Sequence, residues 1–379
     1  MMEKTFAEVF PPGEFLKEEL ESRGWSQIEF AEILGKTPAL VNELVMARRA
    51  VTPETAKALA RAFGTSAQYW LNLESAYQLW KTKDADESIS RRANLYRFAP
   101  IKEMVKRNWV EGSENIDVLE SQVLKFFKIK SLDESELELA HAARKSTPYH
   151  EVTPSQRAWL SRARSLGKAV ITKPLSKRSL DEGFGSLRSM LHSIAEIRKV
   201  PRVLADMGVR LVVVEALPQT RIDGACLWLD KASPIVALSL RYDRVDAFWF
   251  TLLHELNHVA SGDGVRSTVL DIDLVKDSPT GMQQNQPSEH KANVFASEFL
   301  IPKSEIEDFI GRTAPLFSRT KIVRFANRIK VHPGIVVGQL QYRGQLPYSQ
   351  HRRLLEKVRH VIMPSALTDG WGYIAPAVL

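Results

Sequence analysis

The sequence predicts a multidomain protein with an all-α N-terminal part, a helical connector and an α+β C-terminal part. The chain has 379 residues, which is more than one ordinary domain requires. Three changes of pattern give the expected boundaries. Short helical segments with clear start and stop signals fill residues 1–80, polar and mostly helical sequence fills 81–200, and β-branched runs followed by amphipathic helices fill 201–379.

The composition is typical of a globular protein of the cell interior. Hydrophobic residues make up 44% of the chain, which is enough to form cores. The sequence has no unbroken apolar run of membrane-spanning length and no secretory signal pattern. A single cysteine, Cys226, excludes an internal disulfide and a cysteine-rich zinc finger. We therefore expect a cytoplasmic protein that does not enter a membrane.

The net charge of +7 is unevenly distributed along the chain. Residues 1–80 contain 8 Lys and Arg against 11 Asp and Glu, whereas residues 81–200 contain 23 against 16. The basic excess therefore lies in the middle of the chain. Bulk charge is weak evidence for a nucleic-acid partner of the N-terminal part.

Capping residues mark five short helices in residues 1–80. Ser26 and Glu29, three residues apart, form a capping box, and Gly35 ends the helix that they begin. Each of the next two helices begins with a Thr-Pro pair, in which Thr37 or Thr52 is the N-cap and the proline takes the first helical position. The N-terminal part is therefore expected to be all-α.

Residues 27–46 are predicted to form a helix, a glycine turn and a second helix. The second helix begins with short side chains, as a helix that enters the DNA major groove requires. Its N-terminal side chains would read bases, the N-terminus of the first helix would meet a phosphate, and the arginines would contact the backbone. A helical protein-interaction module is the alternative. The candidate DNA contacts are Ser26, Gln27, Lys36, Thr37, Asn42, Arg48 and Arg49.

Residues 10–80 resemble the HigA-type antitoxins of the XRE helix-turn-helix family. The matching stretches are PPGEFLKEEL, SQIEFAEILG, TPETAKALARAFGTS and YWLNLESAY. The resemblance implies a homodimer that binds double-stranded operator DNA and either regulates its own operon or restrains a partner toxin. The recognition helix has fewer long polar side chains than is usual in this family, so only Thr37 and Asn42 are placed to read bases.

A small sheet followed by two helices is expected in the C-terminal part. Residues 209–214, 224–229 and 235–240 are short β-branched or aromatic runs separated by turn residues. A helix capped by Asp243 should then carry the sequence DRVDAFWFTLLHELNHVASG. Residues 263–287 are expected to be a loop, and the second helix carries SEHKANVFASEFL.

The first of these helices contains the pattern H-E-x-x-H, from His254 to His258. Histidines at positions i and i+4 project from one helix face, so both can bind a single ion. A catalytic Zn²⁺ takes three protein ligands and leaves one position open. Glu255 lies about 100° around the helix, where it can act as a general base without joining the ligands. A chance match on a surface helix is the alternative, but the apolar flanks indicate a buried helix, whose polar residues need partners.

The third ligand should come from the second helix. Glu289 and His290 are both suitable donors, and because a helix turns adjacent side chains in different directions, one excludes the other. The spacing alone leaves both open.

The stretch from about Val209 to Tyr348 resembles the ImmA/IrrE-type metallopeptidases. The matching motifs are FWFTLLHELNH and the run EHKANVFASEFLIP that begins at Glu289. The resemblance implies a zincin-like metallopeptidase domain in which His254, His258 and Glu289 bind Zn²⁺ and Glu255 is the general base. It assigns helix packing to Asn293 and Phe295. Asn257 and the SGDG turn after the motif depart from the family pattern.

Two functions are therefore considered. The first is a DNA-binding transcriptional regulator, similar to antitoxins, whose zinc-dependent endopeptidase domain cleaves a protein partner such as a repressor or an antitoxin. The second is a non-catalytic zinc-containing sensor or antitoxin that binds operator DNA and a partner toxin. The presence of Glu255 favours the enzyme, because a purely structural zinc site needs no base. The sequence also offers no obvious fourth protein ligand that would close the site.

Overall fold

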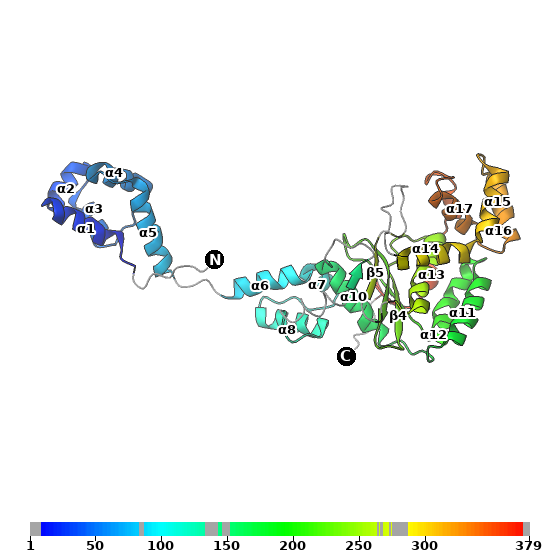
Figure 1. The fold of residues 1–379 in the computed structure, drawn as a ribbon. Helices are drawn as coiled ribbons and strands as arrows, with labels where there is room; N and C mark the ends of the chain where they lie inside the picture. Colours follow the sequence, from blue (N-terminus) through cyan, green and yellow to red (C-terminus); the bar gives the residue numbers. More distant parts are fainter. Residues whose placement is uncertain are drawn as a thin grey trace. The chain divides into compact units, whose positions relative to one another are not determined.

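The computed structural model describes residues 9–82, 87–132, 143–145, 152–263, 265, 268–272, 274 and 287–373. The chain forms two compact units, Met1–Ile89 and Ser90–Leu379 (Figure 1). No helix in the described ranges is both long and apolar enough to span a membrane. The predicted multidomain architecture, with a helical N-terminal part and an α+β C-terminal part, is confirmed.

Residues 9–82 form the five predicted helices. The capping box is present: the Ser26 hydroxyl accepts the N–H of Glu29, and the Glu29 carboxylate accepts the N–H of Ser26. Thr37, Thr52 and Ser66 cap the next three helices. The helices are α1 (Pro12–Arg23), α2 (Gln27–Leu34), α3 (Pro38–Val45), α4 (Pro53–Phe63) and α5 (Ala67–Lys81).

Aromatic side chains form the centre of this five-helix core. The rings of Phe30 and Phe63 stack with centroids 4.8 Å apart, and the Phe63 and Trp70 centroids are 5.8 Å apart. Gly13 allows α1 to pass close to the end of α3, because a Cβ at this position would lie 2.3 Å from the carbonyl oxygen of Val45. These contacts fix α2 and α3 against the rest of the unit.

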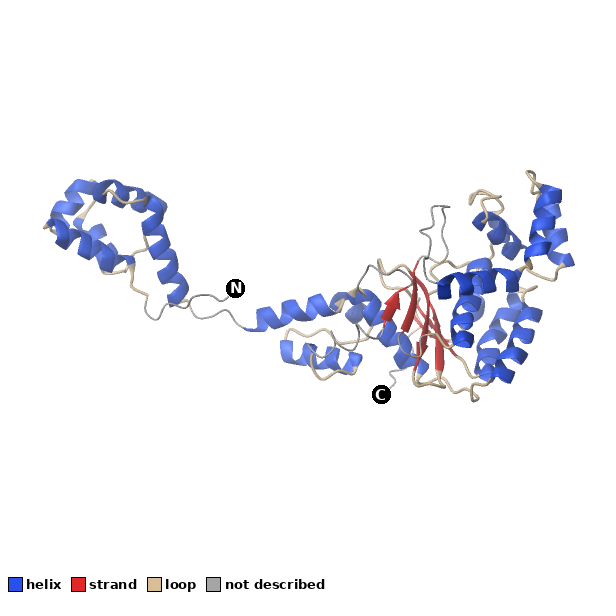
Figure 2. Ribbon diagram, viewed as in Figure 1, coloured by secondary structure: helices blue, strands red, loops and turns tan. Residues whose placement is uncertain are grey.

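The second unit is built on a six-stranded mixed sheet with the strand order β1-β5-β3-β4-β2-β6. Figure 2 shows the strands between the helices of this unit. Strand β3 is antiparallel to β4 and β5, whereas β2 pairs in parallel with β4 and β6, and β1 pairs in parallel with β5. The strands are β1 (Ala143–Lys145), β2 (Arg210–Val214), β3 (Ile222–Trp228), β4 (Pro234–Leu238), β5 (Thr268–Ile272) and β6 (Leu367–Asp369).

The three strands expected from the sequence are β2, β3 and β4, with ends shifted by one or two residues. The expectation that residues 263–287 form a loop is wrong for Thr268–Ile272, which is strand β5. This short run is TVLDI, and its backbone pairs with β3 on one side and with β1 on the other. Long-range pairing therefore orders a segment whose flanks carry loop-forming residues.

Helices cover both faces of the sheet (Figure 1). Successive residues of β2 point to opposite faces, so Val213 belongs to one hydrophobic core and Val212 to the other. The helices of this unit are α6 (Glu87–Phe98), α7 (Ile101–Lys106), α8 (Ile116–Phe127), α10 (Pro154–Gly167), α11 (Lys177–Met190), α12 (Val200–Met207), α13 (Val245–Ser261), α14 (Pro287–Leu300), α15 (Lys303–Thr313), α16 (Arg319–Arg328), α17 (Pro333–Tyr342) and α18 (Arg359–Ile362), with short 3-10 helices at Ile194–Lys199 and Arg352–Leu354.

Much of the segment 81–200, expected to be a helical connector, packs against the sheet. Helix α10 lies on β2, β3 and β4, and Trp159 in this helix is fully buried. The Trp159 Nε1–H donates a hydrogen bond to the carbonyl oxygen of Val214, at 2.9 Å. Helices α6 to α8 contribute to the same core, so this face of the sheet is covered by residues that precede it in sequence.

Helix α13 is buried over most of its length and carries the H-E-x-x-H motif. Its N-cap is Arg244, which makes no capping side-chain hydrogen bond, so the prediction of Asp243 as the cap is wrong. The N–H of Val245 instead donates to the carbonyl oxygen of Glu356, while Asp243 accepts the N–H of Val358. A tertiary contact therefore replaces the local cap.

Candidate metal centre and nucleic-acid interface

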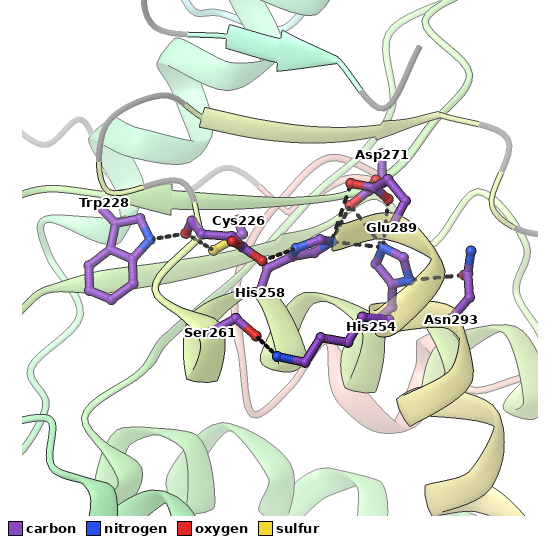
Figure 3. Close-up of polar contacts among 10 residues, drawn as sticks. Cys226, Trp228, His254, His258, Ser261, Asp271, Glu289 and Asn293 are labelled. Atoms are coloured by element: carbon purple, nitrogen blue, oxygen red, sulfur yellow. Dashed lines mark hydrogen bonds and ion pairs between the residues drawn. The ribbon is translucent and has the colours of Figure 1, made fainter. Parts of the chain in front are cut away.

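The two motif histidines converge on one point. His254 and His258 lie one turn apart on α13, both fully buried, with their Nε2 atoms 3.0 Å apart. The Glu289 carboxylate enters from the first turn of α14 and lies 3.3 Å from His254 Nε2 and 3.5 Å from His258 Nε2. The structure thus brings together the three predicted ligands (Figure 3). His290, the alternative donor, is exposed.

A fourth donor, Asp271, lies in the same cluster and was missed from the sequence. Its Oδ2 lies 3.4 Å from His254 Nε2 and 3.9 Å from His258 Nε2. One ligand atom from each of the four residues lies within 4.8 Å of the others. Asp271 belongs to β5, and the sequence signal was weak: a single acid in an apolar run of five residues.

Outer hydrogen bonds fix the orientation of both imidazoles. His254 Nδ1 lies 3.1 Å from Asn293 Oδ1, and His258 Nδ1 lies 3.1 Å from Asp263 Oδ2. Each oxygen accepts a hydrogen bond from Nδ1–H, which leaves the Nε2 lone pair facing the cluster. Asn293, expected to be a packing residue, therefore positions a histidine. The SGDG turn that departs from the family pattern supplies Asp263.

Glu255 is fully buried and faces strand β3. A Cβ on Gly224 would lie 2.2 Å from Glu255 Oε1, so only glycine leaves room for the carboxylate. Burial raises the pKa of Glu255 well above its ordinary value, and the neighbouring carboxylates of Asp271 and Glu289 raise it further. Glu255 is therefore placed beside the cluster as a group that can hold a proton.

The donor set fits a divalent cation. Both carboxylate oxygens of Glu255 and Asp271, and one oxygen of Glu289, are buried and accept no hydrogen bond from any residue in the described ranges. Donors that bind one tetrahedral Zn²⁺ at about 2.0–2.1 Å lie about 3.3 Å from each other. The separations between each histidine Nε2 and the other donors here are 3.0–3.9 Å. A cation at the centre would satisfy the oxygens of Asp271 and Glu289, which otherwise have only the two histidines to balance their charge.

Without a metal, protons stabilise the cluster. Burial lowers the pKa of His254, but Asp271 and Glu289 outweigh it and raise the pKa to about 9. Burial also lowers the pKa of His258, and the same two carboxylates again bring it above its ordinary value. Burial raises the pKa of Glu289, but its interactions with both histidines outweigh burial and leave the pKa below its ordinary value. A metal ion would therefore compete with protons for this site.

The metal-free protein should lose stability as the pH rises. Because the folded-state pKa of His254 is about 9 against 6.5 when unfolded, its contribution is complete below pH 6.5 and disappears as the pH passes through about 9. The loss should be about 3 kcal/mol in the free energy of unfolding. Urea unfolding of chelator-treated full-length protein between pH 6 and pH 10 measures it. The decrease in the free energy of unfolding with pH should be smaller in His254→Gln than in wild type. An equal decrease in both proteins would contradict the assignment.

The candidate DNA contacts lie on or next to α2 and α3. All except Gln27, which is partly buried, are exposed. Asn42 Nδ2 donates to Gln27 Oε1 at 3.2 Å and so links the two helices. Lys36 and Arg49 form surface ion pairs with Glu54 and Glu43.

The N-terminus of α2 already has an anionic partner. The Glu29 carboxylate accepts the N–H of Ser26, and this hydrogen bond lowers the pKa of Glu29. The Ser26 hydroxyl is likewise engaged, by the N–H of Glu29. A phosphate contact at Ser26 would therefore have to compete with the capping box.

Comparison with known families matches both units. A helix-turn-helix family model matches residues 16–70, and a model of the IrrE N-terminal-like domain of the M78 peptidases matches residues 206–337. An Escherichia coli K12 protein described as the uncharacterized HTH-type transcriptional regulator YddM is 37% identical over 82 residues, which are 21% of this chain and 87% of YddM. The chain belongs to the helix-turn-helix regulators and carries an M78 peptidase domain. The resemblances to XRE-type and ImmA/IrrE-type proteins are confirmed.

Other relatives also match part of this regulator. Virulence-associated protein I of Dichelobacter nodosus is 41% identical over 80 residues, which are 21% of this chain and 74% of that protein. The crystal structure of a hypothetical protein from E. coli aligns with 26% of this chain and 100% of its own, at 31% identity and a TM-score of 0.21.

Proposed function

We propose that this regulator binds operator DNA through its first unit and cleaves a protein partner through a zinc-dependent endopeptidase in its second unit. His254, His258 and Glu289 would hold the zinc ion, and Glu255 would act as the general base. The observation that carries the proposal is the convergence of these three donors beside a buried glutamate whose oxygens accept no hydrogen bond within the described ranges. The match to the M78 peptidases supports it.

Each residue has a defined part in this chemistry. Bound Zn²⁺ supplies a Lewis acid that polarises a peptide carbonyl and acidifies water. Glu255 would take the proton from the attacking water and pass it to the leaving amine. Asn293 and Asp263 keep the histidine Nε2 atoms turned to the metal by binding Nδ1.

An apolar pocket next to α13 supports a peptide substrate. Phe250 lines it, and the Phe250 ring centroid lies 6.2 Å from that of His254 and 6.4 Å from that of Tyr342. Its wall also includes Leu300, Ile335 and Tyr348, together with the polar side chains of Arg244, Asp246 and Gln339. A pocket of this kind, one helical turn from His254, suits an apolar side chain of a protein substrate.

The test is metal-dependent proteolysis. Zinc-loaded full-length protein is incubated with an extract of its host cells, and new protein N-termini are labelled and identified. The proposal expects a small set of new N-termini that a chelator suppresses and that added zinc restores. The same N-termini with and without the chelator would contradict a zinc-dependent peptidase.

The second candidate function is a non-catalytic zinc-containing sensor or antitoxin that binds operator DNA and a partner toxin. Two observations favour it. Asp271 supplies a fourth donor to the cluster, and the four donor side chains are at most 2% exposed. In this case the extract would show no zinc-dependent cleavage, although the purified protein would still bind zinc.

In the first unit, α3 would be the recognition helix of a homodimer on an inverted-repeat operator. Thr37 and Asn42 would contact bases, whereas Lys36, Arg48 and Arg49 would contact the phosphate backbone. Ser26 and Gln27 would lie near a phosphate. The family match and the exposure of these side chains support this arrangement. The resemblance to HigA-type antitoxins suggests that the protein regulates its own operon or restrains a toxin.

Arg48 and Asn42 should affect DNA binding in different ways. Arg48→Ala should weaken binding to all sequences and reduce the slope of log K against log salt by about 1. Asn42→Ala should cost about 1–3 kcal/mol on the operator only. Fluorescence anisotropy with DNA from upstream of the gene and with scrambled DNA measures both. Lys17→Ala, on α1, is the control, and an unchanged salt slope in Arg48→Ala would contradict a phosphate contact.

A further inference from the structure

We propose that Asp271 is a fourth protein ligand of the metal centre, so that in the resting protein four side chains hold the ion and no position is open to water. The inference rests on the proposed zinc site and adds a residue from strand β5 to it. Its consequence is a resting peptidase that stays closed to water until a protein substrate displaces Asp271, because hydrolysis requires an open coordination position.

Asp271 lies nearly as close to the two histidine Nε2 atoms as Glu289 does. Asp271 Oδ2 lies 3.4 Å from His254 Nε2, and Glu289 Oε2 lies 3.3 Å from the same atom. To His258 Nε2 the corresponding carboxylate distances are 3.9 Å and 3.5 Å. Figure 3 shows both carboxylates directed at the histidine pair. An ion within reach of the three predicted ligands is therefore also within reach of Asp271.

The burial of Asp271 gives independent support. The side chain is fully buried, and neither carboxylate oxygen accepts a hydrogen bond from any residue that the structure describes. A buried carboxylate is costly unless a cation balances it. The nearest cationic groups are the imidazoles, whose Nε2 atoms lie 3.4 and 3.9 Å from Asp271 Oδ2. When those nitrogens bind a metal they carry no proton, and the remaining Nδ1–H groups face Asn293 and Asp263, so the ion itself is left to balance Asp271.

The sheet fixes Asp271 in this position. In the pairing of β5 with β3, Asp271 lies opposite Gly224, the glycine that leaves room for the Glu255 carboxylate. The strand therefore holds Asp271 next to both the ligands and the general base. On its other edge β5 pairs with the three residues of β1. The pairing fixes the backbone of Asp271, so an open coordination position would require only its side chain to leave the ion.

Cobalt and azide test this directly. Full-length protein is loaded with Co²⁺, and its visible absorption spectrum is recorded during titration with azide, which binds an open position. The wild-type spectrum should not respond. In Asp271→Asn the spectrum should shift in a saturable way, and competition with a chelator should show metal affinity at least about tenfold lower. Asp230→Asn, at an exposed aspartate in the turn after β3, should behave as wild type.

The outcomes separate this inference from the proposed function. If wild-type protein binds no cobalt and no zinc, the metal site itself is wrong. If it binds cobalt but azide shifts the wild-type spectrum, the site is open and Asp271 is not a ligand, while the peptidase proposal stands. If azide changes the spectrum of neither wild type nor Asp271→Asn, Asp271 is not the residue that closes the site. An azide response of the wild type excludes Asp271 as a ligand even if the variant does not fold.

Discussion

Replacing Glu255 by Gln is expected to slow substrate cleavage by about 10²–10⁴-fold, the usual contribution of a general base, while the metal stays bound. Glutamine keeps the shape of the side chain but cannot take a proton. The Glu255 oxygens lie against Gly224, and Glu255 is not among the four clustered donors. Metal content should therefore stay at that of wild type. The rate is measured as the appearance of the new N-termini that zinc-loaded wild type generates in cell extract.

The matched control is Glu298→Gln, an exposed glutamate on α14, which should cleave at the wild-type rate. Wild-type turnover by Glu255→Gln would exclude Glu255 as the base. Loss of metal from this variant would instead show that Glu255 is a ligand. Either result would require a different assignment of the carboxylates around the two histidines.

The parts of the structure that depend on local chemistry could be predicted from the sequence. The helix starts of the first unit follow from side chains that cap backbone groups two or three residues away, such as Ser26 and Thr37. The i, i+4 spacing of His254 and His258 likewise needs only helical geometry to bring two Nε2 atoms together. Local geometry is independent of the rest of the fold, so a short sequence motif is enough to predict it.

The remaining parts depend on contacts between distant segments. Asp271 reaches the centre because β5 pairs with β3, more than 40 residues earlier in the chain, and a pattern of five residues does not reveal that pairing. Asn293 is part of a recognised motif, but its bond to His254 depends on how α14 packs on α13. The packing of α10 on the sheet has the same cause: its buried face is visible in the sequence, but the surface that it covers is not.

Alanine at Glu289 is expected to remove the metal, whereas alanine at His290 is not. The Glu289 side chain is 2% exposed and lies within 3.5 Å of both histidine Nε2 atoms, whereas His290 is exposed on the same turn of α14. Elemental analysis of purified protein should find about one zinc per chain in wild type and in His290→Ala, and little in Glu289→Ala. A ligand at about 1,000 times its Kd stabilises a protein by about 4 kcal/mol. The melting temperature should therefore be higher in wild type and His290→Ala than in Glu289→Ala.

The amount of zinc that Glu289→Ala still binds tests whether Asp271 is a ligand. If Asp271 binds the ion, His254, His258 and Asp271 still provide three donors in this variant, and chelator competition should find weak residual zinc binding. That binding should disappear when Asp271→Asn is added to Glu289→Ala. If Asp271 does not bind, Glu289→Ala alone should already abolish it. Full zinc occupancy in Glu289→Ala, with loss in His290→Ala, would reverse the assignment and exclude the geometry of the centre described here.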